Sequence, residues 1–165
     1  YYPSFPNLGR GFDSPHPHHT YNTAMNIFLS VPFTSKTEPS GVVQEQYRRV
    51  LTELLTGLRA HGHTVYCALE YAQWRIDDMA QPEDELRHDF QEIDSADQLI
   101  ILLEETVSAG VQIENGYAYA KQKAVVVYQI GKPAWSNIAF ARLNGHAIIP
   151  VQSENDFVQQ VLARF

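Results

Sequence analysis

Apolar runs and amphipathic segments alternate along most of the chain. Five short apolar runs predict strands, and they span Met25–Val31, Thr64–Ala68, Leu99–Leu103, Ala124–Tyr128 and Ala147–Val151. Five segments with apolar residues three and four positions apart predict helices, namely Val42–His61, Pro82–Ala96, Ser108–Lys123, Trp135–Asn144 and Glu154–Phe165. The run Leu99–Leu103 holds only leucine and isoleucine, which is typical of a strand buried on both faces.

This alternation predicts an α/β fold, because a helical crossover between successive strands makes them run parallel. We expect a three-layer, doubly wound, parallel five-stranded sheet of the flavodoxin or Rossmann-like kind, and the strand order 2-1-3-4-5 is favoured. Ligands of such sheets bind beyond the carboxyl ends of the strands. That rule selects the segments Ser30–Lys36, Ala68–Trp74, Glu104–Glu114 and Gln129–Ser136.

The first part of the chain has a different composition. Residues 1–23 carry four prolines and three clustered histidines, with neither a helical nor a strand period. We expect a flexible N-terminal arm over residues 1–23 and a single α/β catalytic domain over residues 24–165. The histidines have no matching ligands at a fixed spacing elsewhere, so a solvated arm is favoured over a metal site.

Charge and composition narrow the possible partners. The formal charge is −7, and the longest basic cluster is Arg48-Arg49, so a nucleic-acid surface, which needs a basic stripe, is disfavoured. No apolar run approaches the ~20 residues that span a bilayer, and we expect no membrane partner. The single cysteine, Cys67, lies in an apolar stretch, which indicates a buried small side chain and fits a reducing cytoplasm.

The segment from Ser108 to Ala118 concentrates candidate chemistry. Ser108 is placed to cap a helix, and Gly110 permits close approach of a ligand or another backbone. The free N–H groups and positive dipole end of such a helix make an anion site. Glu114 lies further along the same helix, in what we expect to be a partly apolar pocket. By composition alone, a glutamate at such a position is more often a solvent-exposed residue of a helix than a catalytic residue.

Two more carboxylates lie in the preceding segment. Asp89 is predicted to point toward the same sheet edge as Glu114, whereas Asp97 ends a helix just before the run Leu99–Leu103. Asp97 either caps this helix–strand turn or joins the site, and both interpretations stay open. Several carboxylates around one pocket can act as nucleophile, hydroxyl acceptor and proton donor, which is the division of labour that glycosidic cleavage uses.

These residues carry a resemblance to the nucleoside 2-deoxyribosyltransferase superfamily. Glu114, Gly116 and Ala118 are similar to its nucleophile signature, a glutamate followed by any residue, glycine, any residue and alanine. Asp89, with Ala96-Asp97, resembles the aspartate pattern that precedes this signature. The strand end around Ser30 resembles the first substrate loop of the superfamily, and the match runs in order from about residue 25 to residue 165.

Within the superfamily, the chain looks most like the nucleoside 5'-monophosphate N-glycosidases. Ser108 and Gly110 resemble the phosphate-binding Ser-x-Gly stretch of that branch. Ser136 falls where the branch places a second phosphate-binding serine from a neighbouring subunit, which implies a homodimer or a higher homo-oligomer. The resemblance implies neither a metal nor another cofactor.

The implied reaction is hydrolysis of the N-glycosidic bond of a nucleoside 5'-monophosphate, with a pyrimidine nucleotide such as CMP favoured. Glu114 would attack C1' and form a glycosyl-enzyme ester, which water would hydrolyse to (deoxy)ribose 5-phosphate. Asp89 would accept a hydrogen bond from the sugar, and Asp97 would help to protonate the leaving base, or these roles would be exchanged. Ser30 is a further substrate-binding candidate, and the aromatic candidates for stacking on the base are Phe33, Tyr71 and Trp74.

Two alternatives of different class remain at this point. A base-exchanging transferase would use Glu114 and Asp89 in the same way but would pass the sugar to a second base. A non-catalytic nucleotide sensor would keep Ser108 and Gly110 and turn nothing over. A dinucleotide enzyme is disfavoured, because no G-x-G-x-x-G follows the first predicted strand.

Overall fold

The structure is a computed structural model that describes residues 23–75 and 82–165. The expected N-terminal arm, residues 1–23, therefore lies almost entirely outside the described residues. Among the helices of the described part, none is long and apolar enough to cross a membrane.

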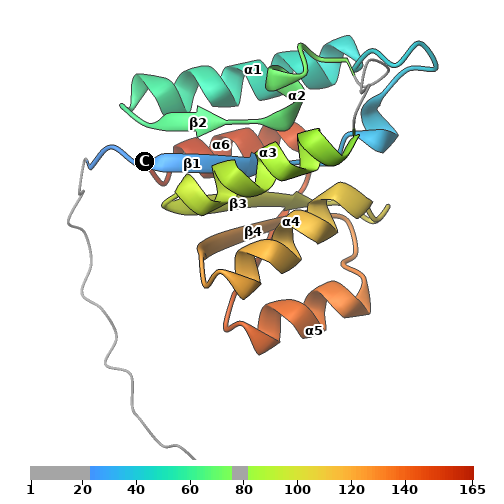
Figure 1. The fold of residues 1–165 in the computed structure, drawn as a ribbon. Coiled ribbons are helices and arrows are strands. Elements are labelled where there is room, and N and C mark those ends of the chain that lie inside the picture. Colours follow the sequence, from blue (N-terminus) through green and yellow to red (C-terminus); the bar gives the residue numbers. More distant parts are fainter. Residues whose placement is uncertain (1–22, 76–81) are drawn as a thin grey trace, which may run out of the picture.

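The centre of the molecule is a five-stranded parallel sheet in the order β2-β1-β3-β4-β5 (Figure 1). Its strands are β1 (Asn26–Ser30), β2 (Thr64–Tyr66), β3 (Gln98–Leu103), β4 (Ala124–Ile130) and β5 (Ile148–Val151). All four neighbouring pairs are parallel. The predicted fold class and strand order are confirmed.

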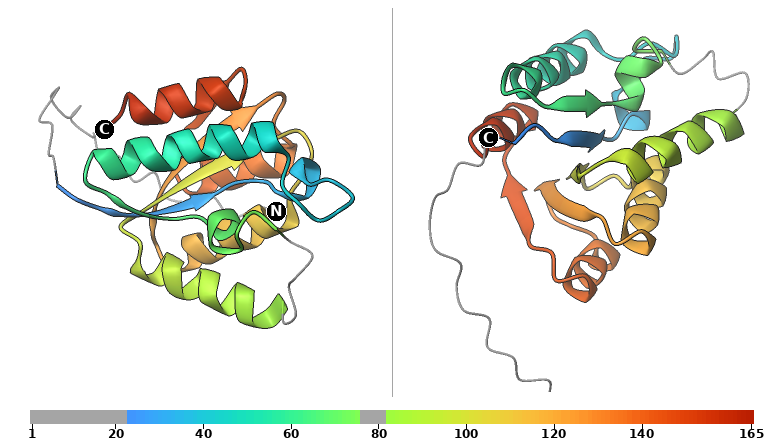
Figure 2. Two further views of the ribbon diagram at one scale, coloured as in Figure 1. Left: turned by 90° about the horizontal axis from the view of Figure 1, so that it is seen from above. Right: turned by 60° about the vertical axis from the view of Figure 1, so that its left-hand side comes forward.

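Helices cover both faces of this sheet, which makes three layers (Figure 2). One face carries α1 (Glu45–Ala60) and α6 (Glu154–Leu162), and the other carries α3 (Pro82–Ser95), α4 (Ala109–Ala120) and α5 (Trp135–Leu143). Two short elements were not predicted, the 3-10 turn η1 (Thr34–Lys36) and α2 (Ala68–Tyr71). The predicted strand Thr64–Ala68 ends early because Ala68 already begins α2, and a four-residue helix is too short to show a period.

The two sides of the sheet bury separate apolar cores, and β3 contributes to both. Its residues Ile100 and Leu102 pack with α1 and α6, while Leu99, Ile101 and Leu103 pack with α3 and α4. Every residue of β3 after Gln98 is buried. The interpretation of the Leu/Ile run as a strand covered on both faces is therefore confirmed.

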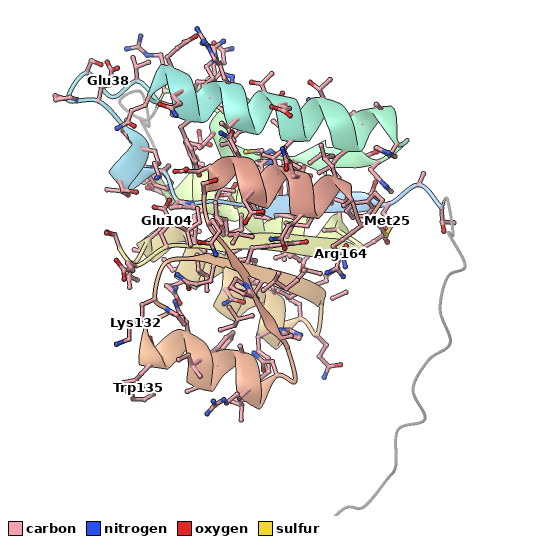
Figure 3. The ribbon with its side chains drawn as sticks, turned by 180° about the vertical axis from the view of Figure 1, so that it is seen from behind. Met25, Glu38, Glu104, Lys132, Trp135 and Arg164 are labelled. Carbon is pink, nitrogen blue, oxygen red and sulfur yellow. The ribbon has the colours of Figure 1, made fainter. Side chains whose placement is uncertain are left out.

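The carboxyl edge of the sheet is held together by an ion-pair network. The Lys36 Nζ lies 2.7 Å from Glu104 Oε1 and 2.7 Å from Glu154 Oε1, so it joins η1 to the residue after β3 and to the start of α6. Figure 3 shows Glu104, Lys132 and Trp135 toward this edge, and Met25 and Arg164 at the opposite, amino edge. These two ion pairs hold the loop after β1 at the carboxyl ends of the strands.

Candidate active site

Glu114 reaches the interior because of its position on α4. The buried residues of this helix are Val111, Glu114, Asn115 and Ala118, which form one stripe at helical spacing. The stripe faces the sheet, and Glu114 lies in the middle of the helix, beside Ser30 at the carboxyl end of β1. The side chain of this carboxylate is thereby removed from solvent, and the residue is only 8% exposed.

Ser30, the last residue of β1, is the direct partner of Glu114. Its hydroxyl Oγ donates a hydrogen bond to Glu114 Oε2, and Ser30 itself is fully buried. Burial raises the pKa of Glu114 to about 7, and the negative charge of Asp89 acts in the same direction. The Ser30 hydrogen bond lowers the pKa, because it stabilises the ionised carboxylate.

Asp89 approaches the same place from α3. Burial raises the pKa of this carboxyl above its usual value, and a hydrogen bond from Tyr66 opposes the rise. The Tyr66 hydroxyl donates to Asp89 Oδ1 over 2.8 Å. Ser30 at the end of β1 thus donates to Glu114, and Tyr66 at the end of β2 donates to Asp89. Both hydrogen bonds lie at the carboxyl edge of the sheet.

Glu114 and Asp89 line one cavity of about 150 Å³. A third acid, Glu85, lies on its wall, and the other lining side chains are apolar or carry the thiol of Cys67. They come from Val31, Phe33, Cys67, Ala68, Leu69, Ala72, Pro82 and Leu86. The predicted meeting of Glu114 and Asp89, with Ser30 and Phe33 beside them, is thus present in the structure.

Cys67 lies in this wall as a buried thiol. It is 2% exposed, and burial raises its pKa to about 12. A thiol with so high a pKa stays protonated near neutrality and is a poor nucleophile. The interpretation of Cys67 as a small buried side chain is confirmed.

The N-terminus of α4 carries an unused hydroxyl. Ser108 occupies the N-cap position but makes no capping hydrogen bond, and its buried Oγ has no partner within the described residues. Such a buried hydroxyl normally finds a partner, and the first N–H groups of a helix have none within the helix. At Gly110 an added Cβ would lie 3.3 Å from Phe33 Cε1, so the loop after β1 packs closely over this helix end.

Asp97 does not belong to this group, which corrects the prediction of a catalytic role. It directly precedes β3, and its Oδ2 accepts a hydrogen bond of 2.7 Å from the backbone N–H of Asn26, the first residue of β1. Ser30 lies four residues further along the same strand, on the order of 13 Å away. Asp97 therefore fastens the amino ends of two strands, which is a structural role but a different one from the capping of the helix–strand turn that the sequence suggested.

Trp74 is also misplaced in the sequence-based prediction. Its ring belongs to the core beneath α1, where it is 8% exposed and lies under the guanidinium of Arg48 at 5.7 Å. The residue adopts φ +63°, and its backbone N–H donates to the carbonyl oxygen of Leu69. This turn directs the ring into the core, and Trp74 is not part of the cavity wall.

Ser136 lies in the first turn of α5 and is exposed, away from the wall of the cavity around Glu114. Its expected entry into the site of a neighbouring subunit stays a prediction.

Tyr66 was not among the predicted site residues. Its hydroxyl at the carboxyl end of a predicted strand is the one signal in the sequence that marks it.

The fold is similar to solved structures of distant sequence. The CMP N-glycosidase BcmB of Clostridium botulinum is 20% identical, with a TM-score of 0.61 over 84% of this chain and 98% of that protein. BlsM is 18% identical, with a TM-score of 0.60 over 84% of this chain and 87% of that protein. A 2-deoxyribosyltransferase of Bacillus psychrosaccharolyticus is 22% identical, with a TM-score of 0.56 over 82% and 94%.

No protein-family model matches the sequence, and no curated protein matches it either. At identities this low, the structural likeness is evidence for a common fold. The chain therefore has the five-stranded α/β fold of the CMP N-glycosidase BcmB and of a bacterial 2-deoxyribosyltransferase.

Proposed function

We propose that the protein is an N-glycosidase that hydrolyses a nucleoside 5'-monophosphate, with a pyrimidine nucleotide such as CMP preferred. The observation that carries this proposal is the buried Glu114, held by Ser30 and facing a cavity that it shares with Asp89. A carboxylate in an apolar wall is a strong nucleophile once it is ionised, because water no longer solvates it. The likeness to a CMP N-glycosidase supports the choice of substrate.

In the first step, ionised Glu114 attacks C1' and the bond from C1' to the base nitrogen breaks, which leaves a glycosyl ester on Glu114. The departing base needs a proton. Asp97 lies at the opposite sheet edge, so the proton comes from Asp89, whose pKa is raised by burial. In the second step, water adds to C1', its proton passes to Asp89, and the ester bond to Glu114 breaks to release the sugar 5-phosphate.

The phosphate of the substrate binds at the N-terminus of α4. The buried and unpartnered Ser108 Oγ donates to it, together with the backbone N–H of Gly110. Each hydrogen bond to a charged group contributes roughly 1.5–3 kcal/mol. Ser136 of a neighbouring subunit completes the clasp, so the active enzyme is a homodimer or larger. Phe33, packed against Gly110 on the cavity wall, stacks on the base.

A base-exchanging transferase is the second candidate. The apolar wall around Glu114 and Asp89 favours it, because a wall that repels water prolongs the life of the glycosyl ester. The likeness to a 2-deoxyribosyltransferase points the same way. Both candidates share the first step and differ in whether water or a second base receives the sugar.

The test is a chromatographic assay of base release from nucleosides and their 5'-monophosphates, with and without a second free base. Release from a monophosphate alone, lost in Glu114→Ala and kept in the exposed-residue control Glu53→Ala, is the expected result. Exchange from unphosphorylated nucleosides would replace the hydrolase by the transferase. Tight binding of monophosphates without any turnover would show a nucleotide sensor and refute both enzymes.

A further inference from the structure

A second hollow lies between α5 and the strands β4 and β5, with a volume of about 370 Å³. It is lined by the apolar side chains of Ile138, Ile148 and Pro150 and by three polar residues, Gln129, Arg142 and His146, among others. None of its lining residues belongs to the cavity around Glu114. The hollow is thus a separate feature of the fold, and nothing in the proposed reaction uses it.

Gln129 lines this hollow and carries an unused hydrogen-bond acceptor. Gln129 is 2% exposed, and its Nε2 donates to the carbonyl oxygen of Ile130 over 2.7 Å. A carbonyl oxygen can only accept, so this bond fixes the orientation of the amide. The other amide atom, Oε1, is buried and has no partner within the described residues. Because an unpaired buried acceptor is costly, a molecule that supplies an N–H or O–H donor would relieve the cost.

The opposite end of the hollow carries the charged side chain of Arg142 and the imidazole of His146. Helix α5 runs back from the carboxyl edge to the amino edge, and its last turn meets the next loop where His146 N–H donates to Ala141 O over 2.8 Å. Arg142 and His146 therefore lie on the order of 10 Å from Gln129 along the strand direction. The guanidinium of Arg142 forms no ion pair within the described residues, which is notable in a chain of net charge −7.

The end of the hollow near Gln129 lies beside an acidic residue, Glu105. Glu105 Oε1 accepts a hydrogen bond of 3.2 Å from the backbone N–H of Lys132, and a Cβ on Gly131 would lie 3.0 Å from Glu105 Cγ. Lys132 and the neighbouring Trp135 project at the carboxyl edge of the sheet (Figure 3). Glu105 and Lys132 carry opposite charges at this end, so an anion is favoured at the Arg142 end, whereas an N–H donor is favoured near Gln129.

We propose that this hollow is a second binding site, for a small flat anion that carries its negative group at one end and an N–H donor at the other. The negative group binds at Arg142 and His146, the ring lies between Ile138 and Ile148, and the donor reaches Gln129 Oε1. Nucleoside 5'-monophosphates with an amino group on the base belong to this class. The site is separate from that of the proposed reaction, because none of its residues lines the cavity around Glu114.

The test uses the full chain with Glu114→Gln, so that no ligand is consumed. Two-dimensional nuclear magnetic resonance follows the backbone amides and the Gln129 side-chain amide during titration with CMP, cytidine or inorganic phosphate. With CMP, we expect saturable shifts at Gln129, Ile138 and Ile148, separate from any shifts around Ser108. Cytidine and inorganic phosphate should each bind the same residues at least roughly tenfold more weakly, because each lacks one of the two anchors.

Two variants remove one anchor each. Gln129→Leu deletes the acceptor, and Arg142→Gln deletes a charge at an exposed position, so the second variant serves if the first does not fold. A matched control, Arg49→Gln, removes a charge from an exposed ion pair on α1. Shifts that weaken in each hollow variant that folds and persist in the control support the proposal. CMP shifts confined to the surroundings of Glu114 and Ser108, or unchanged in both variants, would overturn it, and this result would leave the proposed N-glycosidase intact.

Discussion

Glu114 should make the folded protein less stable as the pH rises, and glutamine at this position should remove the effect. Burial raises the pKa of Glu114 from its ordinary value of 4.5 to about 7. Below the lower value, the carboxyl is protonated in the folded and the unfolded chain alike, so the shift has no consequence. Between the two values, the unfolded chain gives up the proton while the folded chain keeps it, and rising pH therefore favours unfolding.

The magnitude follows from the difference between the two pKa values. At about 1.4 kcal/mol for each pKa unit, the loss of stability reaches about 3 kcal/mol once the pH exceeds the folded-state value. Glu114→Gln keeps the size of the side chain and a hydrogen-bonding partner for Ser30 but carries no charge at any pH. We expect the variant to gain about 3 kcal/mol over the wild type between about pH 4.5 and about pH 8.5.

Urea denaturation at these two pH values measures the free energies of unfolding of the wild type, Glu114→Gln and the control Glu53→Gln. Glu53 lies on the exposed face of α1, so its variant shows the effect of losing a solvated charge. Any change of packing that is independent of pH cancels in the comparison. A stability difference between wild type and Glu114→Gln that is the same at both pH values would refute the raised pKa of Glu114 and, with it, the proposal that this carboxyl is partly protonated near neutrality.

Substitutions at three further positions test individual contacts. Ser30→Ala removes the hydrogen bond that lowers the pKa of Glu114, so the acid limb of the pH–rate profile for base release should move to higher pH, while Ser30→Thr should retain the wild-type profile. Tyr66→Phe removes the donor to Asp89 and should raise the pKa of that carboxyl further, which a shifted limb of kcat/KM against pH would reveal. Asp97→Ala removes the 2.7 Å contact with the N–H of Asn26, and thermal unfolding should show a loss of about 0.5–1.5 kcal/mol with kcat unchanged; a large fall in kcat at unchanged stability would contradict the structural role.

The sheet was predictable because each strand is a distinct apolar run and each crossover an amphipathic helix. The burial of Glu114 was also predictable, since its spacing from Val111 and Ala118 places it on the buried stripe of α4. The error at Asp97 has a simple physical origin. A residue directly before a parallel strand lies at the amino edge, whereas ligands bind at the carboxyl edge, so the predicted order of elements already placed Asp97 on the wrong side.

Other features depend on contacts that no local pattern encodes. Trp74 follows β2 at the carboxyl edge, where an aromatic residue on the cavity wall is a reasonable expectation, yet its left-handed backbone turns the ring into the core. The hydrogen bond from Tyr66 to Asp89 joins residues that are 23 positions apart and depends on how α3 packs on the sheet. The hollow under α5 arises from the spacing between a helix and two strands, which only the folded chain defines.

The helix α4 fixes the distance between Ser108 and Glu114. In the proposed substrate, this distance has to match the one between the phosphate and the sugar carbon C1'. Ser108 and Glu114 are six residues apart on this helix, on the order of 9 Å along its axis. A phosphate held at the N-terminus therefore places a sugar carbon, several bonds away, opposite the carboxylate of Glu114. The positive end of the helix dipole attracts the phosphate, while the carboxylate lies in the apolar cavity wall, where burial holds its pKa near neutrality. A nucleoside without the phosphate would still enter the cavity but would lose the anchor that fixes its depth, so the geometry of this helix supports the proposal that a 5'-monophosphate is the preferred substrate.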